Sequence, residues 1–133
     1  MRSGYGGDQL GYQQDEDCLY LNVVRPSGCE NEKLPVAVWI HGGGLFEGGT
    51  PDRRYNLSFI VENSVKIGKP IMAVSIAYRL GPWGFLNGNE VLAEGQTNIG
   101  LKDQRLALHW INENIAAFGG GYLLKQSLSK CSC

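Results

Sequence analysis

The hydrophobic positions of this chain gather in short runs that polar and glycine-rich segments separate. Cys18–Pro26 is rich in β-forming residues and predicts a strand. Pro35–Ile40 and Pro70–Leu80 are almost continuously apolar, which is typical of strands buried on both faces of a sheet. The pattern therefore predicts three strands, of which the last two are central.

Two segments show helical spacing instead. A short helix that ends at Gly68, just before Pro70, is predicted by apolar residues at helical intervals: Leu57, Ile60, Val61 and Val65. A longer amphipathic helix is predicted over Asn98–Phe118, with glycines at its C-terminal end. Its apolar stripe is expected to consist of Leu101, Leu108, Ile111, Ile115 and Phe118. A Gly- and Asn-rich loop, from Gly81 to Gly95, is expected before it.

The alternation of strands and helices predicts an α/β fold with a mostly parallel central sheet and flanking helices. After Gly120 the pattern changes, and no further strand is expected. We predict a partial domain over residues 14–120, an N-terminal segment over 1–13 and an aberrant tail over 121–133. A sheet of this kind needs more strands, so the fold is expected to be incomplete at both ends, marginally stable and prone to aggregation.

Composition narrows the function. The net charge of −1 argues against a nucleic-acid or membrane-surface partner, because such binders carry a basic excess. No apolar run approaches a membrane span, and no signal peptide is visible at the N-terminus. The cysteines form no C-x-x-C pair, so a zinc site is disfavoured, and we expect no cofactor. They are Cys18, Cys29, Cys131 and Cys133.

The most unusual stretch is VWIHGGGLFEGG, in which three glycines follow a strand and His41. Its spacing fits neither the G-x-G-x-x-G dinucleotide motif nor a P-loop, since Glu47 and Thr50 stand where a glycine and a lysine would be needed. It does match the HGGG type of loop that supplies oxyanion-hole N–H groups in lipases and esterases. A tight glycine-rich turn without chemistry is the alternative.

Four motifs follow one another over residues 15–120: EDCLYLNVVRP, LPVAVWIHGGGLFEGG, AVSIAYRLGPWGFL and NIGLKDQRLALHWINENIAAFGG. Together they resemble the type-B carboxylesterase/lipase family, which includes cholinesterases and fungal lipases, and the region around Trp83 is similar to fungal members. The resemblance implies an α/β-hydrolase fold and hydrolysis of small-molecule carboxylic esters. It also implies oxyanion-hole roles for Gly43 and Gly44, a structural ion pair between Arg79 and Asp103, and a disulfide partner of Cys18 upstream. We therefore expect Cys18 to be unpaired here.

The chain departs from the family pattern after FGG, where the family continues with the strand and G-x-S-x-G elbow that carry the nucleophile. No G-x-S-x-G occurs in these residues. We therefore expect an inactive fragment that keeps the oxyanion loop but lacks the nucleophile, acid and catalytic histidine. A non-catalytic α/β-hydrolase-like binding module is the alternative, although such modules keep the whole fold. Substrate, acyl-chain preference, compartment and oligomeric state are not specified by the sequence.

Several other residues have a functional and a structural interpretation. His41 is expected to orient the loop rather than act as a base, and His109 to pack or be exposed on its helix. Tyr78, Trp83 and Phe85 are expected either to line an acyl pocket or to pack in the core.

Two further features lie in polar segments. Asn56 begins an Asn-Leu-Ser sequon, which is glycosylated only in a secreted protein. The acidic residues Asp15, Glu16 and Asp17 are expected to form a solvated turn. The family is often secreted, so the missing leader leaves the compartment undetermined.

Overall fold

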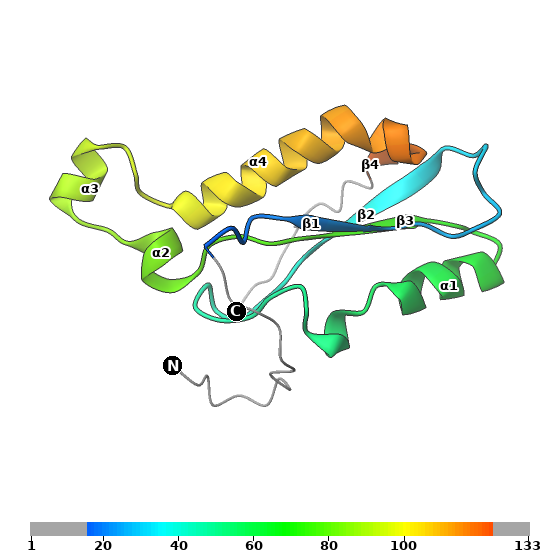
Figure 1. The fold of residues 1–133 in the computed structure, drawn as a ribbon, viewed down its shortest axis with the longest axis horizontal. Coiled ribbons are helices and arrows are strands. Elements are labelled where there is room, and N and C mark those ends of the chain that lie inside the picture. Colours follow the sequence, from blue (N-terminus) through cyan, green and yellow to red (C-terminus); the bar gives the residue numbers. More distant parts are fainter. Residues whose placement is uncertain (1–15, 124–133) are drawn as a thin grey trace, which may run out of the picture.

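One mixed four-stranded sheet, in the order β1-β3-β2-β4, organises the molecule. The computed structural model describes residues 16–123. The strands are β1 (Leu21–Val24), β2 (Leu34–Ile40), β3 (Met72–Ile76) and β4 (Gly120–Leu123). β3 pairs antiparallel with β1 and parallel with β2, and β2 also pairs parallel with β4 (Figure 1). The carboxyl ends of β2 and β3 therefore meet at one edge of the sheet, and β4 runs toward that edge but ends opposite Val36.

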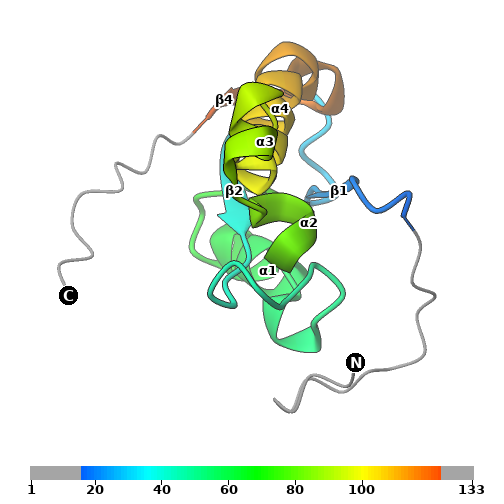
Figure 2. The same cartoon turned by 90° about the vertical axis from the view of Figure 1, so that its left-hand side faces the viewer.

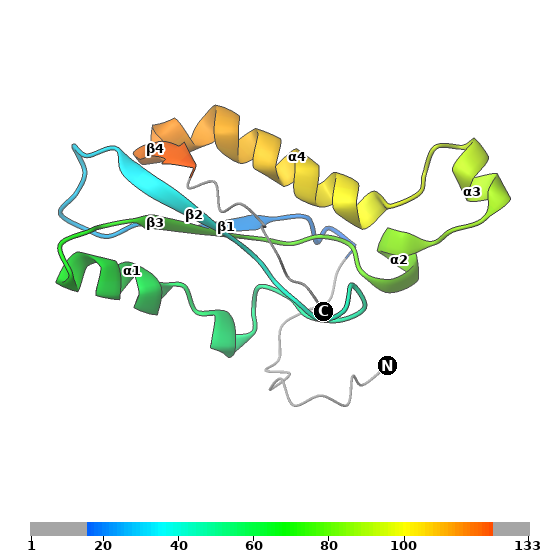
Figure 3. The same ribbon diagram turned by 180° about the vertical axis from the view of Figure 1, so that it is seen from behind.

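Helices cover both faces of this sheet. The helix α4 (Ile99–Asn114) lies along one face, and α1 (Ser58–Lys66) lies along the other (Figures 1 and 3). A view along the sheet shows the two helices on opposite sides of β2 (Figure 2). A short 3-10 helix, η1 (Arg53–Tyr55), precedes α1, and another, η2 (Ile115–Phe118), follows α4. The predicted α/β class with a mostly parallel centre is confirmed.

The core lies between the sheet and α4, and β3 is its centre. Every residue of β3 is buried, as expected for a strand with neighbours on both sides. The buried apolar cluster consists of Leu34, Val36, Met72, Val74, Ile76, Ile111 and Ile115. β2 differs, because Trp39 and Ile40 at its end are 40% and 36% exposed. β4 pairs with Leu34–Val36, so within the described residues the second half of β2 has a strand neighbour on the β3 side alone.

The predicted end of α1 at Gly68 is confirmed. Gly68 has a φ of 69°, and its N–H donates to the carbonyl of Val65, while the N–H of Lys69 donates to the carbonyl of Ser64. This is the Schellman arrangement, in which a left-handed residue lets the chain turn back and satisfy the last helical carbonyls. The following chain then leads directly into β3.

The expected apolar stripe of the long helix is only partly the buried face. The helix ends at Asn114 and tightens into η2, and Leu101, Leu108 and Phe118 are exposed. Gly100 and Asp103 are buried instead, together with Ile111. A Cβ on Gly100 would lie 2.5 Å from the carbonyl oxygen of Arg79, so its lack of a side chain permits this close approach.

Two predictions about irregular segments were wrong. The expected Gly- and Asn-rich loop contains two one-turn helices, α2 (Gly81–Phe85) and α3 (Asn89–Ala93). The chain after Gly120 was expected to form no strand, whereas β4 extends from Gly120 to Leu123. Hydrogen bonding to β2 holds this segment in a strand, which its composition alone did not indicate.

Candidate functional site

The segment from His41 to Gly49, called the glycine loop below, leaves the carboxyl end of β2 and returns upon itself. The N–H groups of Phe46 and Glu47 both donate to the carbonyl of Gly43, at 3.0 Å each. The N–H of Gly81, at the start of α2, donates to the carbonyl of Leu45 at 2.8 Å. The loop is therefore held by its own backbone and by the segment that follows β3.

Two glycines of this loop are required by backbone contact. Gly43 has a φ of 127°, and a Cβ there would lie 1.8 Å from the carbonyl oxygen of Glu47. A Cβ on Gly48 would lie 2.4 Å from the carbonyl oxygen of Gly42. Gly44 differs, because its φ of 62° favours glycine but open space surrounds the position of its Cβ.

The backbone N–H groups of Gly43 and Gly44 are available for a ligand. Both residues are exposed, and neither N–H donates a hydrogen bond to any partner among residues 16–123. N–H groups in a fixed turn form a concave site for negative charge. This arrangement suits an oxygen atom that carries or acquires negative charge.

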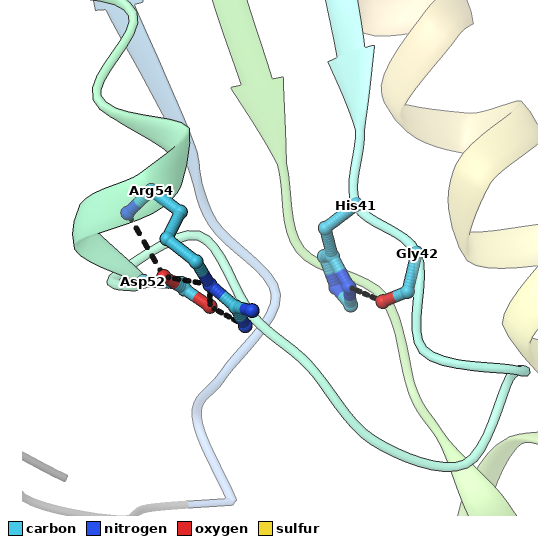
Figure 4. Close-up of polar contacts among 4 residues, drawn as sticks. All are labelled: His41, Gly42, Asp52 and Arg54. Carbon is cyan, nitrogen blue, oxygen red and sulfur yellow. Dashed lines mark hydrogen bonds and ion pairs between the residues drawn. The ribbon is translucent and has the colours of Figure 1, made fainter. Parts of the chain in front are cut away.

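His41 anchors the start of the loop. Its ring is buried and stacks on the ring of Tyr78, with centroids 4.5 Å apart and planes 18° apart. Its Nδ1 lies 3.0 Å from the carbonyl oxygen of Gly42 (Figure 4), and since a carbonyl only accepts, Nδ1 is the donor. The Tyr78 hydroxyl donates to the His41 carbonyl at 2.8 Å, and burial raises the pKa of Tyr78. These contacts support a loop-orienting role for His41.

Arg79 and Asp103 connect the end of β3 to α4. The carboxylate of Asp103 accepts hydrogen bonds from the backbone N–H, Nε and Nη2 of Arg79, at 3.1, 2.8 and 2.7 Å. The Asp103 side chain is only 5% exposed, and the Arg79 side chain is 40% exposed. The hydrogen bonds from Arg79 hold the pKa of Asp103 below its usual value, and the same carboxylate raises the pKa of Arg79. The pair fixes the chain immediately before α2.

A cleft of about 780 Å³ lies next to the glycine loop. Its walls come from the segment before β1, the far end of the loop and the segment after β3, and they include Glu16, Tyr20, His41, Gly48, Tyr78 and Trp83. Gly43 and Gly44 do not line it. The cleft and the available N–H groups are therefore neighbouring features at one edge of the sheet.

The remaining candidates differ in their exposure. Trp83 is 81% exposed on α2 and borders the cleft, while Tyr78 is buried and Phe85 packs against Gly100. His109 is exposed on α4. Of the three side chains considered for an acyl pocket, Trp83 is therefore the one whose exposure would let it contact a ligand.

The cysteines and the sequon have separate positions. Cys18 and Cys29 are free thiols, whereas Cys131 and Cys133 lie outside the described residues. Asn56 is exposed at the end of η1. Within residues 16–123 no helix is long and apolar enough to cross a membrane, and no three His, Cys, Asp or Glu side chains gather as metal ligands.

Sequence reasoning missed two groups that shape the loop. Gly48 lies against the His41 ring, since a Cβ there would approach Nδ1 to 2.7 Å. Leu45 has a φ of 63°, which side-chain-bearing residues rarely adopt, and its carbonyl accepts from Gly81. The second glycine cluster of the motif was the available signal for Gly48, whereas nothing in the sequence indicates the backbone of Leu45.

Comparison with known proteins places these features in a family context. The sequence profile of the Carboxylesterase family matches residues 2–121. The chain is 50% identical over 117 residues to lipase 1 of Geotrichum candidum, covering 87% of this chain and 20% of that protein. It is 56% identical over 106 residues to secreted lipase 1 of Botryotinia fuckeliana, covering 79% and 18%. The chain thus spans about a fifth of the length of these relatives.

Solved structures agree. A thermophilic pNB esterase matches 81% of this chain, and 21% of its own, with a TM-score of 0.71 and 41% identity. EstA of Aspergillus niger matches 80% of this chain, and 20% of its own, with a TM-score of 0.69 and 40% identity. The sheet and its two helical layers therefore correspond to part of an α/β-hydrolase fold.

Proposed function

Because this chain belongs to the carboxylesterase family, we propose that it carries the oxyanion-binding segment of a lipase-like hydrolase of carboxylic esters. The observation that carries this proposal is that the exposed residues Gly43 and Gly44 have N–H groups without a hydrogen-bond partner in residues 16–123. The names of the relatives, lipases and esterases, support a small-molecule ester as the substrate class.

The chemistry of ester cleavage explains why these groups matter. When a nucleophile adds to the ester carbonyl, negative charge develops on the carbonyl oxygen. N–H donors that are already in position stabilise this charge, and one such donor contributes about 3–4 kcal/mol to lowering the barrier. Glycine at position 44 leaves open the space beside the backbone that the ester would occupy. Gly43 is needed for a different reason, since only glycine permits the turn onto Glu47.

The nucleophile is proposed to come from outside these residues, as are the acid and the histidine. The sequence holds no G-x-S-x-G, the usual elbow of the family. β4 begins at Gly120, directly after Phe118 and Gly119, where the family pattern has the strand that leads to that elbow. Because β4 is parallel to β2, it runs toward the edge that carries the glycine loop, and Leu123 at its end lies opposite Val36. A nucleophile that follows such a strand would approach the available N–H groups.

The first test asks whether the 133-residue chain is active alone. We expect no hydrolysis of a short-chain aryl ester above background, and no labelling by a serine-reactive organophosphate. Turnover that copurifies with the chain, together with labelling, would show that a nucleophile is present within these residues.

The second test supplies the nucleophile. Residues 16–120 would replace the matching segment of lipase 1 of Geotrichum candidum, and Gly44→Ala would be made in this hybrid. Alanine keeps the N–H but adds a methyl group in the open space beside it, which would hold the ester oxygen away from that donor. We expect kcat to fall about 100-fold or more with a much smaller change in KM, as when one oxyanion contact is lost. Gly95→Ala is the matched control, because Gly95 has a similar φ of 65° and equally open surroundings.

The outcomes separate the two functional hypotheses. An equal effect of both substitutions would mean that Gly44 matters only for backbone conformation, and an active hybrid unaffected by Gly44→Ala would remove the oxyanion role. Either result would overturn the oxyanion role of Gly44, whereas a folded hybrid without activity would favour a non-catalytic binding module.

A further inference from the structure

The sequon Asn56-Leu57-Ser58 lies on the connection between η1 and α1, outside the site described above. It is the only N-x-S/T triplet in the 133-residue sequence, and neither Leu57 nor the following Phe59 is proline. Any N-linked glycan on this sequence is therefore confined to one position. The structure shows whether that position can carry one in the folded state.

The acceptor groups of the sequon are open. Asn56 and Ser58 are both exposed. The Oδ1 of Asn56 accepts from the N–H of Ser58 at 3.0 Å, which leaves the amide Nδ2 without a hydrogen-bond partner among residues 16–123. The hydroxyl of Ser58 likewise has none in this part of the chain. The two groups that a glycosyl-transferring enzyme would engage, Nδ2 of Asn56 and the hydroxyl of Ser58, are therefore not occupied by partners within residues 16–123.

The backbone before the sequon is fixed, so its exposure is a stable feature. The carboxylate of Asp52 accepts from the backbone N–H of Arg54 at 2.9 Å and pairs with its guanidinium (Figure 4). The ring of Tyr55 packs on Trp39 of β2, with centroids 5.3 Å apart. The chain is thus anchored up to Tyr55 and presents Asn56 at the surface.

A glycan at Asn56 would also have a physical effect on its surroundings. The first turn of α1 carries Phe59 and Ile60, which are 65% and 52% exposed. Exposed apolar side chains of this size favour association, and a bulky hydrophilic group beside them opposes it. Glycosylation at Asn56 therefore suits the surface on which it lies.

We propose that Asn56 is an N-glycosylation site. In the reaction, the amide Nδ2 of Asn56 attacks the anomeric carbon of a lipid-pyrophosphate-linked oligosaccharide. A carbon–nitrogen bond forms, the bond from that carbon to the pyrophosphate oxygen breaks, and the amide nitrogen loses one proton while the lipid pyrophosphate leaves. This requires entry into the secretory pathway, which agrees with the relatives that are named secreted lipases. The proposal does not depend on the oxyanion role of Gly43 and Gly44.

The test is translation of the full chain, behind a cleavable signal sequence, in the presence of endoplasmic-reticulum microsomes. A second sequon in a C-terminal tag reports that each chain was translocated. We expect one additional endoglycosidase-sensitive mass increment in the wild type, its loss in Asn56→Gln and in Ser58→Ala, and its retention in Asn63→Gln. Asn63 is the matched control because it is exposed on α1 but begins no sequon.

Two results would overturn the proposal. One is a wild-type chain whose tag is glycosylated but which lacks the additional increment. The other is an additional increment that persists in Asn56→Gln. The soluble fraction of glycosylated wild type against Asn56→Gln then measures the effect on the apolar surface of α1, and we expect it to be higher for the wild type.

Discussion

The segments that leave β2 and β3 begin side by side at the same edge of the sheet, yet they differ in whether their hydrogen-bond donors have partners. After β3, the N–H of Ala77 donates to Tyr20, the hydroxyl of Tyr78 donates to His41, and Arg79 pairs with Asp103. After β2, the glycine loop leaves N–H groups exposed and unpartnered within the described chain. The first segment satisfies these donors internally, whereas the second leaves the N–H groups of Gly43 and Gly44 for the ligand role proposed above.

The two segments are also connected, and the direction of support is clear. Tyr78 holds the first residue of the loop, and Gly81 holds the carbonyl of Leu45 at its centre. Both contacts come from the segment after β3, which is itself fixed to α4 through Asp103. Changes after β3 should therefore act mainly on stability, while a change at Gly44 should act mainly on chemistry.

The largest expected effect in the supporting segment is that of Asp103→Ala. This substitution removes an acceptor of three hydrogen bonds and leaves Arg79 without its partner. Breaking a buried pair typically costs 3–5 kcal/mol, and the 40% exposure of the Arg79 side chain places this case near the lower limit, at about 3 kcal/mol. The free energy of unfolding in urea, followed by circular dichroism, measures it.

The matched control is Glu113→Ala, which removes an exposed acid from the same helix. We expect it to change the free energy of unfolding by less than about 0.5 kcal/mol. If the two substitutions had equal effects, the Arg79–Asp103 pair would not be the support of this edge.

A smaller effect is expected for Tyr78→Phe. The substitution keeps the stacked ring but leaves the carbonyl of His41 without its donor, which should cost about 1–2 kcal/mol in unfolding free energy. Tyr20→Phe is the control, since that hydroxyl is exposed and only accepts from Thr50. Faster hydrogen exchange of the Phe46 and Glu47 amides in Tyr78→Phe would locate the change in the loop. Unchanged exchange would show that the Tyr78 hydroxyl does not stabilise the loop.

The smallest effect is a pH dependence. Because the folded chain lowers the pKa of Asp103, its stabilisation is complete above the unfolded value of about 4 and is lost as pH falls through the folded pKa. Arg79 remains charged throughout this range. Urea midpoints measured from about pH 6 down to about pH 3 should fall less steeply in Asp103→Asn than in the wild type. Parallel curves would assign the acid sensitivity to other carboxylates.

The strands β1, β2 and β3 and the helices α1 and α4 were predictable because their patterns are regular over several residues. β2 and β3 are nearly unbroken apolar runs, and the end of α1 has both Gly68 and Pro70. The glycine loop was recognised from its residue types, since consecutive glycines after a strand need a backbone reason. These signals lie within short stretches of sequence, so they can be interpreted without knowledge of the fold.

The errors arose where contacts distant in sequence decide the structure. β4 begins with two glycines and is ordered by pairing with Leu34–Val36, a partner more than eighty residues earlier. The buried face of α4 is set by the backbone of Arg79 and by Asp103, so a hydrophobic pattern misassigned Leu101 and Leu108. The one-turn helix α2 is too short to show any periodicity. Such features follow from the assembled sheet.

The packing of the His41 ring determines when the glycine loop becomes ordered. The ring lies between Tyr78 and the backbone of Gly48, so the two ends of the glycine loop meet on one rigid group. The rotational freedom of the loop is lost during folding, before any ester is bound. In the proposed reaction the N–H dipoles would then need little reorientation as charge develops, and the activation entropy would carry little contribution from the loop.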